Sequence, residues 1–334
     1  MPDDFKLTTP VVLVAFIRPE KIQRVFNEIK KARPEKLFVL SDEGRNEAER
    51  LKVKAVRAII DNGVDWPCQV FKKYAETNLG CKTNIASGID WVFQHVEEAI
   101  ILEDDCLPEQ TFFRFCQELL EKYRYEPKVT NINGTNLAVR DPKFKCADSY
   151  YFANIDMTWG WATWRRAWQH YDVNMKQWPQ WKKDGLLQRV LGNAERADYY
   201  EALLDRYYTG TIDAWPGQWI LDRWALHSLS IAPSNNLVAN IGFDEESSHG
   251  MTDPYDIRAN LPITPIEFPL KHPAEIVAHK KADDFVFRYG IRVNYYLKHK
   301  ILWLLRSRLP RLYKLLRKFW RAFYKKSQSS LPTS

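Results

Sequence analysis

The chain has 334 residues, 45% of them hydrophobic, which is enough for one large α/β domain or two smaller ones. The first 284 residues hold 36 basic and 42 acidic residues, a net charge of −6, so no nucleic acid partner is expected for this body. No segment reaches 18 apolar residues and the acidic start lacks an apolar signal-peptide core, so neither a membrane span nor a signal peptide is expected.

Strands and helices alternate over residues 10–136. Apolar runs predict strands over Val11–Ile17, Leu37–Leu40, Cys68–Tyr74, Ala99–Leu102 and Val129–Ile132. Helices are predicted from Pro19 to Ile29, along an apolar face of Ala48, Leu51, Ala55 and Ile59, over Asn84–Val96, and from Pro108 onward. This alternation predicts an α/β fold with a mainly parallel sheet flanked by helices. The first strand is followed by Phe16-Ile17-Arg18-Pro19 rather than a glycine-rich loop, which argues against a dinucleotide oxidoreductase.

Three adjacent acids, Glu103, Asp104 and Asp105, follow the strand at Ala99–Leu102. Ligands of open α/β sheets bind at the carboxyl ends of the strands, so these acids stand where a ligand is expected. Adjacent carboxylates repel one another unless a cation joins them, and hard oxygen ligands favour Mg²⁺ or Mn²⁺. The alternative is a solvated acidic loop.

Four further segments accompany the acids in a fixed order. They are Asn78-Leu79-Gly80-Cys81-Lys82, Ser87-Gly88-Ile89-Asp90-Trp91, Trp159-Gly160-Trp161-Ala162-Thr163-Trp164 and Asn236-Leu237-Val238-Ala239-Asn240-Ile241-Gly242-Phe243. Over residues 10–250 this order resembles bacterial nucleotide-diphospho-sugar transferases with the GT-A fold, related to the alpha-mannoside beta-N-acetylglucosaminyltransferase family. The resemblance implies an inverting glycosyltransferase with Mn²⁺ or Mg²⁺ under the donor diphosphate. It assigns Asp105 as the metal ligand and Glu103 and Asp104 as ligands of nucleotide and ribose.

Glycosyl transfer also needs a base that takes the proton of the acceptor hydroxyl. Relatives place an acid in a Trp-rich segment, here Ile212–Trp224, where Trp-Pro-Gly-Gln-Trp replaces their frequent Trp-Asp-Tyr-Gln-Trp. The two remaining candidates are Asp213 and Asp222. Asp213 could instead cap the following helix, and Asp222 could pair with a neighbouring Arg.

Four other polar residues are candidates for the donor site, each with a simpler alternative. Arg18 could bind the diphosphate or be a surface charge at a helix start. Asp42 could accept from the nucleotide base or ribose, or belong to a turn. Lys82 could bind phosphate or be solvated, and His249 could bind the metal or diphosphate or be a structural polar residue.

Aromatic residues and the distribution of charge suggest the acceptor and its location. Trp159, Trp161 and Trp164 are candidates for a sugar-stacking wall that binds the acceptor, although core packing is the more common role for at least two of them. Five cysteines match no zinc or redox spacing, which favours reduced thiols and a cytoplasmic location.

The expected organisation has four parts. Residues 1–136 form a nucleotide-sugar-binding half, 137–260 a loop-rich acceptor-binding half of the same catalytic domain, 261–291 a connector and 292–334 a basic amphipathic membrane-associating tail. The 13 basic residues and no acid in 285–334, with apolar residues at helical spacing, indicate peripheral binding to an anionic membrane surface at its inner face. The alternative is a helical tail packed on the acidic body.

The sequence therefore predicts a glycosyltransferase of the hexosyltransferase class. It would move a sugar from a nucleotide-diphosphate sugar donor to a glycan or lipid-linked glycan acceptor. One alternative is a non-catalytic glycan-binding or scaffold protein on the same fold. Another is a nucleotidyltransferase, a class that usually has a glycine-rich phosphate loop near the first strand.

Overall fold

The computed structural model describes residues 5–244, 256–259 and 261–291. The predictions for His249 and for the tail at 292–334 lie outside the described residues. The strands are β1 (Val11–Ala15), β2 (Lys36–Ser41), β3 (Gln69–Tyr74), β4 (Glu98–Glu103), β5 (Cys106–Pro108), β6 (Val129–Asn133), β7 (Tyr150–Ala153), β8 (Trp161–Trp164), β9 (Leu229–Pro233) and β10 (Val238–Asn240). The helices are α1 (Pro19–Ala32), α2 (Glu47–Gly63), α3 (Cys81–His95), α4 (Thr111–Lys122), α5 (Arg165–Trp168), α6 (Trp178–Lys183), α7 (Leu186–Leu191), α8 (Ala194–Tyr208), α9 (Pro216–Ala225) and α10 (Lys280–Phe285).

One large sheet has the strand order β3-β2-β1-β4-β8-β6-β9-β7. The pairs β3/β2, β2/β1, β1/β4 and β6/β9 are parallel, whereas β8 is antiparallel to both of its neighbours and β7 is antiparallel to β9. The predicted α/β fold with a mainly parallel sheet is confirmed. The short strands β5 and β10 form a second, antiparallel pair.

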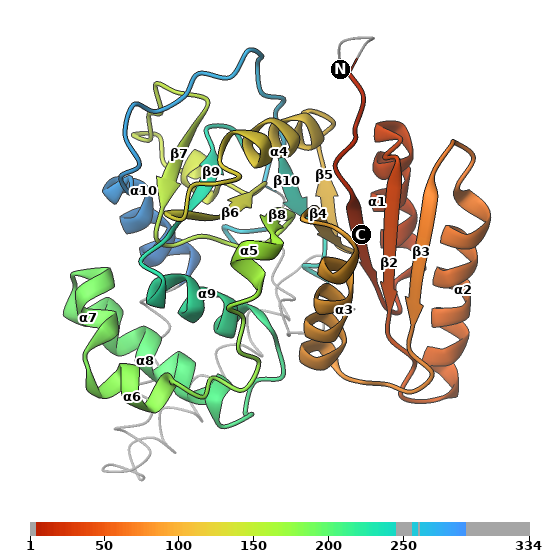
Figure 1. Cartoon of the computed structure of the whole chain (residues 1–334), viewed down its shortest axis with the longest axis horizontal. Coiled ribbons are helices and arrows are strands. Elements are labelled where there is room, and N and C mark those ends of the chain that lie inside the picture. Colours follow the sequence, from red (N-terminus) through yellow and green to blue (C-terminus); the bar gives the residue numbers. More distant parts are fainter. Residues whose placement is uncertain (1–4, 245–255, 260, 292–334) are drawn as a thin grey trace, which may run out of the picture. The chain divides into compact units, whose positions relative to one another are not determined.

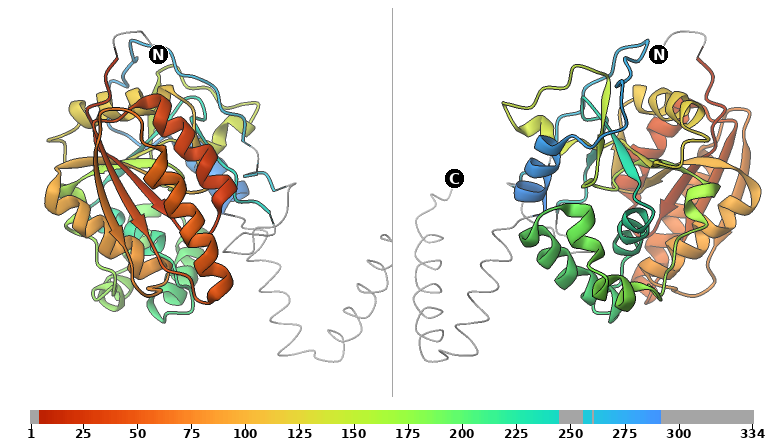
Figure 2. Two further views of the ribbon diagram at one scale, coloured as in Figure 1. Left: turned by 90° about the vertical axis from the view of Figure 1, so that its right-hand side faces the viewer. Right: turned by 60° about the vertical axis from the view of Figure 1, so that its left-hand side comes forward.

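Helices cover both faces of the large sheet (Figure 1). Buried residues of α1, α2 and α4 pack together on one face, and α1 and α2 lie side by side there (Figure 2, left). On the other face, α3 packs with the Trp-rich segments around β8 and the start of α9. Helices α6, α7 and α8 form a group of their own beside α9. Among the described residues, no helix combines the length and the apolar character that a bilayer span requires.

The face that α2 buries differs from the predicted one. Leu51, expected on the apolar face, is 63% exposed, whereas Val53, Val56 and Ile60 are buried. Both sets recur at helical spacing, so periodicity alone does not choose between them. Tertiary packing decides between them: Val56 and Ile60 are buried in the core shared with α1, and of the predicted face only Ile59 packs partly against that core.

Two predicted boundaries also move. Strand β1 ends at Ala15, so Phe16 and Ile17 leave the sheet. Helix α4 begins at Thr111 rather than at Pro108, because Cys106–Pro108 pairs with β10. Both shifts occur next to the acidic triplet and determine which backbone groups surround it.

Candidate functional site

The site lies where the order of parallel strands reverses. From β1 the chain moves first to β2 on one side, and it later returns to the other side of β1 as β4. A crevice forms outside the carboxyl ends of two strands at such a point, and ligands of open α/β sheets bind in it. Arg18 follows β1, and the acidic triplet begins at the last residue of β4, so the two groups flank this point.

Arg18 joins two members of the triplet. Its Nη1 lies 2.8 Å from Asp105 Oδ2, and its Nη2 forms an ion pair with Asp104. The Arg18 side chain is 10% exposed and that of Asp104 is 3% exposed, so this interaction is shielded from water. A planar guanidinium suits two adjacent carboxylates because its donors form a fixed fork.

The cluster holds more negative charge than Arg18 balances. Burial raises the pKa of Asp104, and Asp105 raises it further, while Arg18 opposes both effects. Burial, with the charges of Asp105 and Asp104, raises the pKa of Glu103 to about 8. Because the charges of neighbouring carboxylates contribute to both shifts, a cation beside them would offset that repulsion.

The Trp-rich segment reaches the triplet through Trp215. The side chain of Trp215 hydrogen-bonds Glu103, and its ring stacks on Trp161 with centroids 5.1 Å apart. Asp213, two residues earlier, is exposed and lies against Gly80 at the start of α3. The residue that caps α9 is Trp215, so Asp213 does not cap that helix.

The surroundings of Cys81, the first residue of α3, show that the acidic triplet, the Trp-rich segment and the end of β2 lie close together. Burial raises the pKa of its thiol, and the negative charges of Glu103, Asp213 and Asp42 raise it further, while Arg18 lowers it. Residues from the ends of β1, β2 and β4 and from the start of α9 therefore lie around one thiol.

The carboxylate of Asp42, directly after β2, accepts four hydrogen bonds from the chain. Its Oδ1 accepts from the backbone N–H groups of Glu43 and Leu79, both at 2.9 Å. Its Oδ2 accepts from Gly80 N at 3.0 Å and from Asn78 Nδ2 at 3.2 Å. Four donors fill the acceptor positions of a carboxylate. Of the two roles that the sequence left open for Asp42, its oxygens fulfil that of a turn residue, because they hold the turn that starts α3; binding of a nucleotide base or ribose stays a prediction.

The Asn236–Phe243 motif covers Asp105 from the other side. Ile241 N donates to the backbone oxygen of Asp105 at 2.8 Å. A Cβ added at Gly242 would overlap Asp105 Oδ2, which Arg18 holds, so a larger residue there would require the carboxylate to move. Phe243 in turn packs edge-on against Trp159, with ring centroids 5.7 Å apart.

Of the three candidate acceptor-binding tryptophans, only Trp159 is partly exposed. Trp161 and Trp164 lie on β8 and are 1% exposed, so the prediction that they form part of a sugar-stacking wall is wrong. They pack in the core because a strand between two others buries both of its faces.

Two further predicted residues, Asp222 and Lys82, lie in α9 and α3. Asp222 is 4% exposed and accepts from Asp172 N at 2.9 Å, and burial raises its pKa to about 8. The predicted alternative, pairing with a neighbouring Arg, does not occur with Arg223, which binds Asp156 at 2.8 Å. Lys82 is half-buried in the first turn of α3.

The acidic triplet offers few protein ligands for a divalent ion. Within the described ranges no three His, Cys, Asp or Glu side chains are grouped as ligands. Asp105 Oδ2 binds Arg18, while Oδ1 has the Cys106 Sγ at 3.6 Å. Such a donor set suits an ion that takes one or two carboxylates and completes its shell with water and substrate phosphates, as Mg²⁺ does.

Sequence reasoning missed several residues that shape this site. Trp215 and Gly242 lie inside segments that the sequence singled out, but nothing assigned them a contact. Arg57 of α2, which binds the end of β2, has the sequence context of an ordinary surface charge. Only the three-dimensional path of α2 turns it toward the sheet.

No model of a known protein family matches the sequence, and no curated protein sequence matches it. Solved structures with a similar arrangement include apo UDP-glucose pyrophosphorylase (10% identity, TM-score 0.36, 68% of this chain and 90% of that chain). A second is the galactosyltransferase LgtC in complex with donor and acceptor sugar analogs (12% identity, TM-score 0.33, 64% of this chain and 70% of that chain). A third is HddC from Yersinia pseudotuberculosis (10% identity, TM-score 0.31, 49% of this chain and 80% of that chain). These similarities are too distant to carry a functional argument.

Proposed function

We propose that this chain is a nucleotide-sugar-dependent glycosyltransferase, inverting and assisted by a divalent ion, as its resemblance to the alpha-mannoside beta-N-acetylglucosaminyltransferase family implies. One observation carries the proposal: Arg18 binds Asp104 and Asp105 at the point where the order of parallel strands reverses. Acids and a fork-shaped cation at this place suit a diphosphate bound with a metal.

In this proposal the donor diphosphate lies between Asp105 and the start of α3. Arg18 orients Asp104 and Asp105 and balances part of their negative charge. Lys82, in the first turn of α3, adds a positive charge, and the N-terminus of the 15-residue helix favours phosphate. A divalent ion bound at Asp105 supplies Lewis-acid stabilisation of the leaving diphosphate.

Asp213 is the proposed base. Its carboxylate is exposed, so an acceptor hydroxyl can reach it, and it lies beside the first residues of α3. Asp222 is 4% exposed, which leaves no path for an acceptor. In the reaction Asp213 takes the hydroxyl proton while the acceptor oxygen bonds to the anomeric carbon and the bond to the diphosphate breaks, which inverts that carbon.

The proposed acceptor is a glycan or lipid-linked glycan. Trp159, partly exposed beside Phe243, offers a flat face to a sugar ring. The basic tail at 292–334 would hold the protein at an anionic membrane surface, where a lipid-linked acceptor resides.

The test begins with a thermal-shift panel of UDP-, GDP-, CMP- and dTDP-sugars, each with and without Mn²⁺. A ligand that binds only the folded state raises its stability. The best donor is then incubated with glycan acceptors, and the products are identified. Release of a nucleoside diphosphate with a glycosylated acceptor supports the proposal. Pyrophosphate release from a nucleoside triphosphate and a sugar phosphate would make the protein a nucleotidyltransferase, and glycan binding without turnover would make it a non-catalytic binder.

A further inference from the structure

We propose that Arg57 is a positioning residue that sets the place of Asp42 and, through it, of the Asn78–Gly80 turn where α3 begins. Its importance for donor binding rests on the proposed function, since α3 is the helix assigned to the diphosphate. Arg57 itself reaches neither the acidic triplet nor Asp213 through any contact among the described residues.

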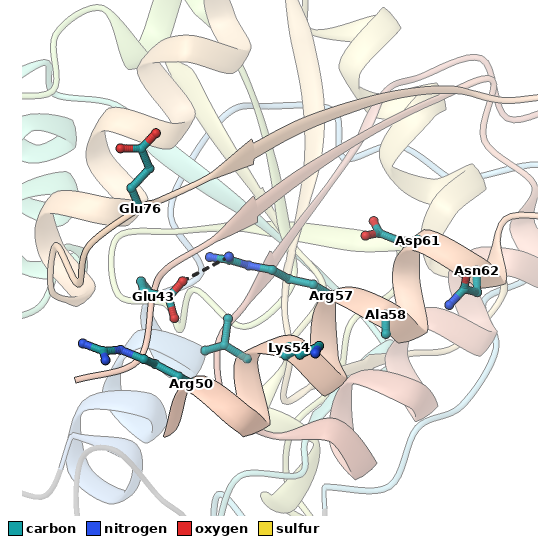
Figure 3. Close-up of a pocket in the computed structure, with 9 residues that line it drawn as sticks. Glu43, Arg50, Lys54, Arg57, Ala58, Asp61, Asn62 and Glu76 are labelled. Carbon is teal, nitrogen blue, oxygen red and sulfur yellow. Dashed lines mark hydrogen bonds and ion pairs between the residues drawn. The ribbon is translucent and has the colours of Figure 1, made fainter. Parts of the chain in front are cut away.

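The guanidinium of Arg57 binds the end of β2 at several points. Its Nε donates to Ser41 Oγ at 3.1 Å, and its Nη1 lies 3.1 Å from Glu43 Oε2 (Figure 3). Its Nη2 approaches the backbone oxygens of Ser41 at 3.4 Å and Asp42 at 3.2 Å. One side chain therefore contacts three successive residues, the last residue of β2 and the two residues that follow the strand.

Arg57 also connects β2 to β3. Its Nη2 donates to the backbone oxygen of Ala75 at 3.0 Å, and the guanidinium lies over the Tyr74 ring, 4.7 Å from its centroid. The Tyr74 hydroxyl donates to Asp61 of α2 at 2.8 Å. The ends of two parallel strands are thus joined to one helix, and the Arg57 side chain is only 19% exposed.

Asp42 continues the connection toward α3. Its backbone oxygen binds Arg57, while its carboxylate binds the N–H groups of Leu79 and Gly80. Asn78 Nδ2 adds a bond to the backbone oxygen of Glu43 at 2.6 Å. A displacement of the β2 end moves this carboxylate, and the turn that it holds moves with it.

Helix α2 carries other basic residues besides Arg57, and two of them do not hold the end of β2 in this way. Arg50 and Lys54 line the same open pocket of about 620 Å³ (Figure 3). Arg50 is 58% exposed and pairs loosely with Glu47 at 3.6 Å, an arrangement that contributes little to stability. The variant Arg50→Gln therefore removes an equal charge from the same helix and pocket, and it is the matched control.

The variants Arg57→Lys and Arg57→Ala test the role. Lysine keeps the charge but presents a single ammonium rather than a fork, so it cannot replace these contacts. We expect the amide protons of Leu79 and Gly80 to exchange about tenfold faster or more in both variants, because local opening of the turn becomes easier. Exchange of α1 amides stays as in the wild type, and Arg50→Gln changes neither set.

Chemical rescue and donor binding complete the test. Millimolar guanidinium should restore slow exchange at Leu79 and Gly80 in Arg57→Ala, whereas ammonium at the same concentration should not. For the nucleotide sugar that stabilises the wild type most, Kd should rise about tenfold or more in Arg57→Lys, a loss that reflects a less preorganised site.

Each outcome decides a separate point. Unchanged exchange at Leu79 and Gly80, or equal acceleration throughout α1, overturns the positioning role. Faster exchange at the turn with an unchanged donor Kd overturns its importance for the donor. If the wild type binds none of the nucleotide sugars, the proposed function fails, and the exchange and rescue measurements alone decide the positioning role.

Discussion

The carboxylate of Asp213 lies directly over Gly80, although the two residues are separated by more than a hundred positions in the chain. A Cβ added at Gly80 would lie 2.8 Å from Asp213 Oδ2. The same glycine has φ 80° and ψ 158°, a conformation that is essentially restricted to glycine. The absence of a side chain at Gly80 therefore permits both the backbone conformation of the turn that Asp42 holds and the close approach of Asp213, the proposed base.

Replacing Gly80 by alanine tests this relationship. We expect Gly80→Ala to lower the free energy of unfolding by about 1–3 kcal/mol through backbone strain. Urea unfolding measures the loss, and Gly192→Ala is the control, because Gly192 has a left-handed φ of 60° with open space around it. The double variant Gly80→Ala/Asp213→Ala should recover only the part that comes from the close contact. Equal losses in Gly80→Ala and Gly192→Ala would contradict the special role of this turn.

The variant Asp105→Ala should abolish Mn²⁺-dependent binding of a nucleotide sugar while the fold remains intact. Removing one carboxylate from a crowded acidic cluster relieves repulsion, and Arg18 keeps its partner Asp104. Calorimetry with and without Mn²⁺ measures the binding, and circular dichroism reports the fold. Asp65→Asn, which changes an exposed carboxylate paired with Lys30, serves as the control. Retention of Mn²⁺-dependent binding in Asp105→Ala would show that another residue holds the ion.

The variant Asp213→Asn should bind donor and metal normally but lose transfer by about two to four orders of magnitude, the usual contribution of a positioned base. Asp222→Asn should have a milder effect, because Asp222 is buried and its amide replacement can still accept from Asp172 N. Initial rates at saturating donor compare the two variants. The opposite ranking would identify Asp222 as the base, and two active variants would place the base elsewhere.

Two buried acids make stability depend on pH. Burial raises the pKa of Asp222 to about 8 and that of Asp283 to about 7. Between about pH 4 and pH 8 the folded protein keeps protons that the unfolded chain has released, so the free energy of unfolding falls as pH rises. Asp222→Asn removes one such group, and its stability relative to the wild type should increase toward pH 8 by at most about 1.4 kcal/mol per unit. Urea titrations at several pH values test this, with exposed Asp184→Asn as the control. A pH-independent difference would show that Asp222 is ionised in the folded protein.

The contacts of α10 and of the residues that follow it determine where the tail can be removed without loss of stability. Asp283 accepts from Asn154 N at 3.2 Å and Ile155 N at 3.1 Å, and Val286 and Phe287 are buried. Truncation after Gly290 should keep donor binding but lose flotation with anionic vesicles, whereas truncation after Ala282 should also lower Tm. The full chain should keep part of its vesicle binding in high salt, because apolar burial resists screening. Equal flotation of the full chain and the shorter form would exclude the tail as the membrane anchor.

The sequence placed Arg18 and the acidic triplet at the same edge of the sheet, although it did not predict the ion pairs between them. Arg18 and the acidic triplet each follow an apolar run, and parallel strands end at the same edge, so their proximity follows from local patterns. The contact between Trp215 and Glu103 does not, because it depends on how α9 packs against α3 and β8.

Roles that depend on burial were harder to predict. An acid in a turn looks the same in sequence whether its oxygens face a ligand or the chain, and Asp42 faces the chain. The sequence likewise does not show whether Trp161 and Trp164 face a ligand or the core. Only the position of β8 between two other strands shows that they are buried. Likewise Arg57 reads as a solvated charge until the orientation of α2 is known.

The position of β8 has a consequence for how the chain can be divided. β8 lies between β4 and β6 and pairs with both, so residues from the expected donor and acceptor halves alternate within one hydrogen-bonded ladder. A fragment that ends at residue 136 would lack β8 and leave the apolar edge of β4 without a partner, and an open edge of this kind templates aggregation. The two halves are therefore not separable modules, and any insertion or fusion that respects the fold belongs outside this ladder.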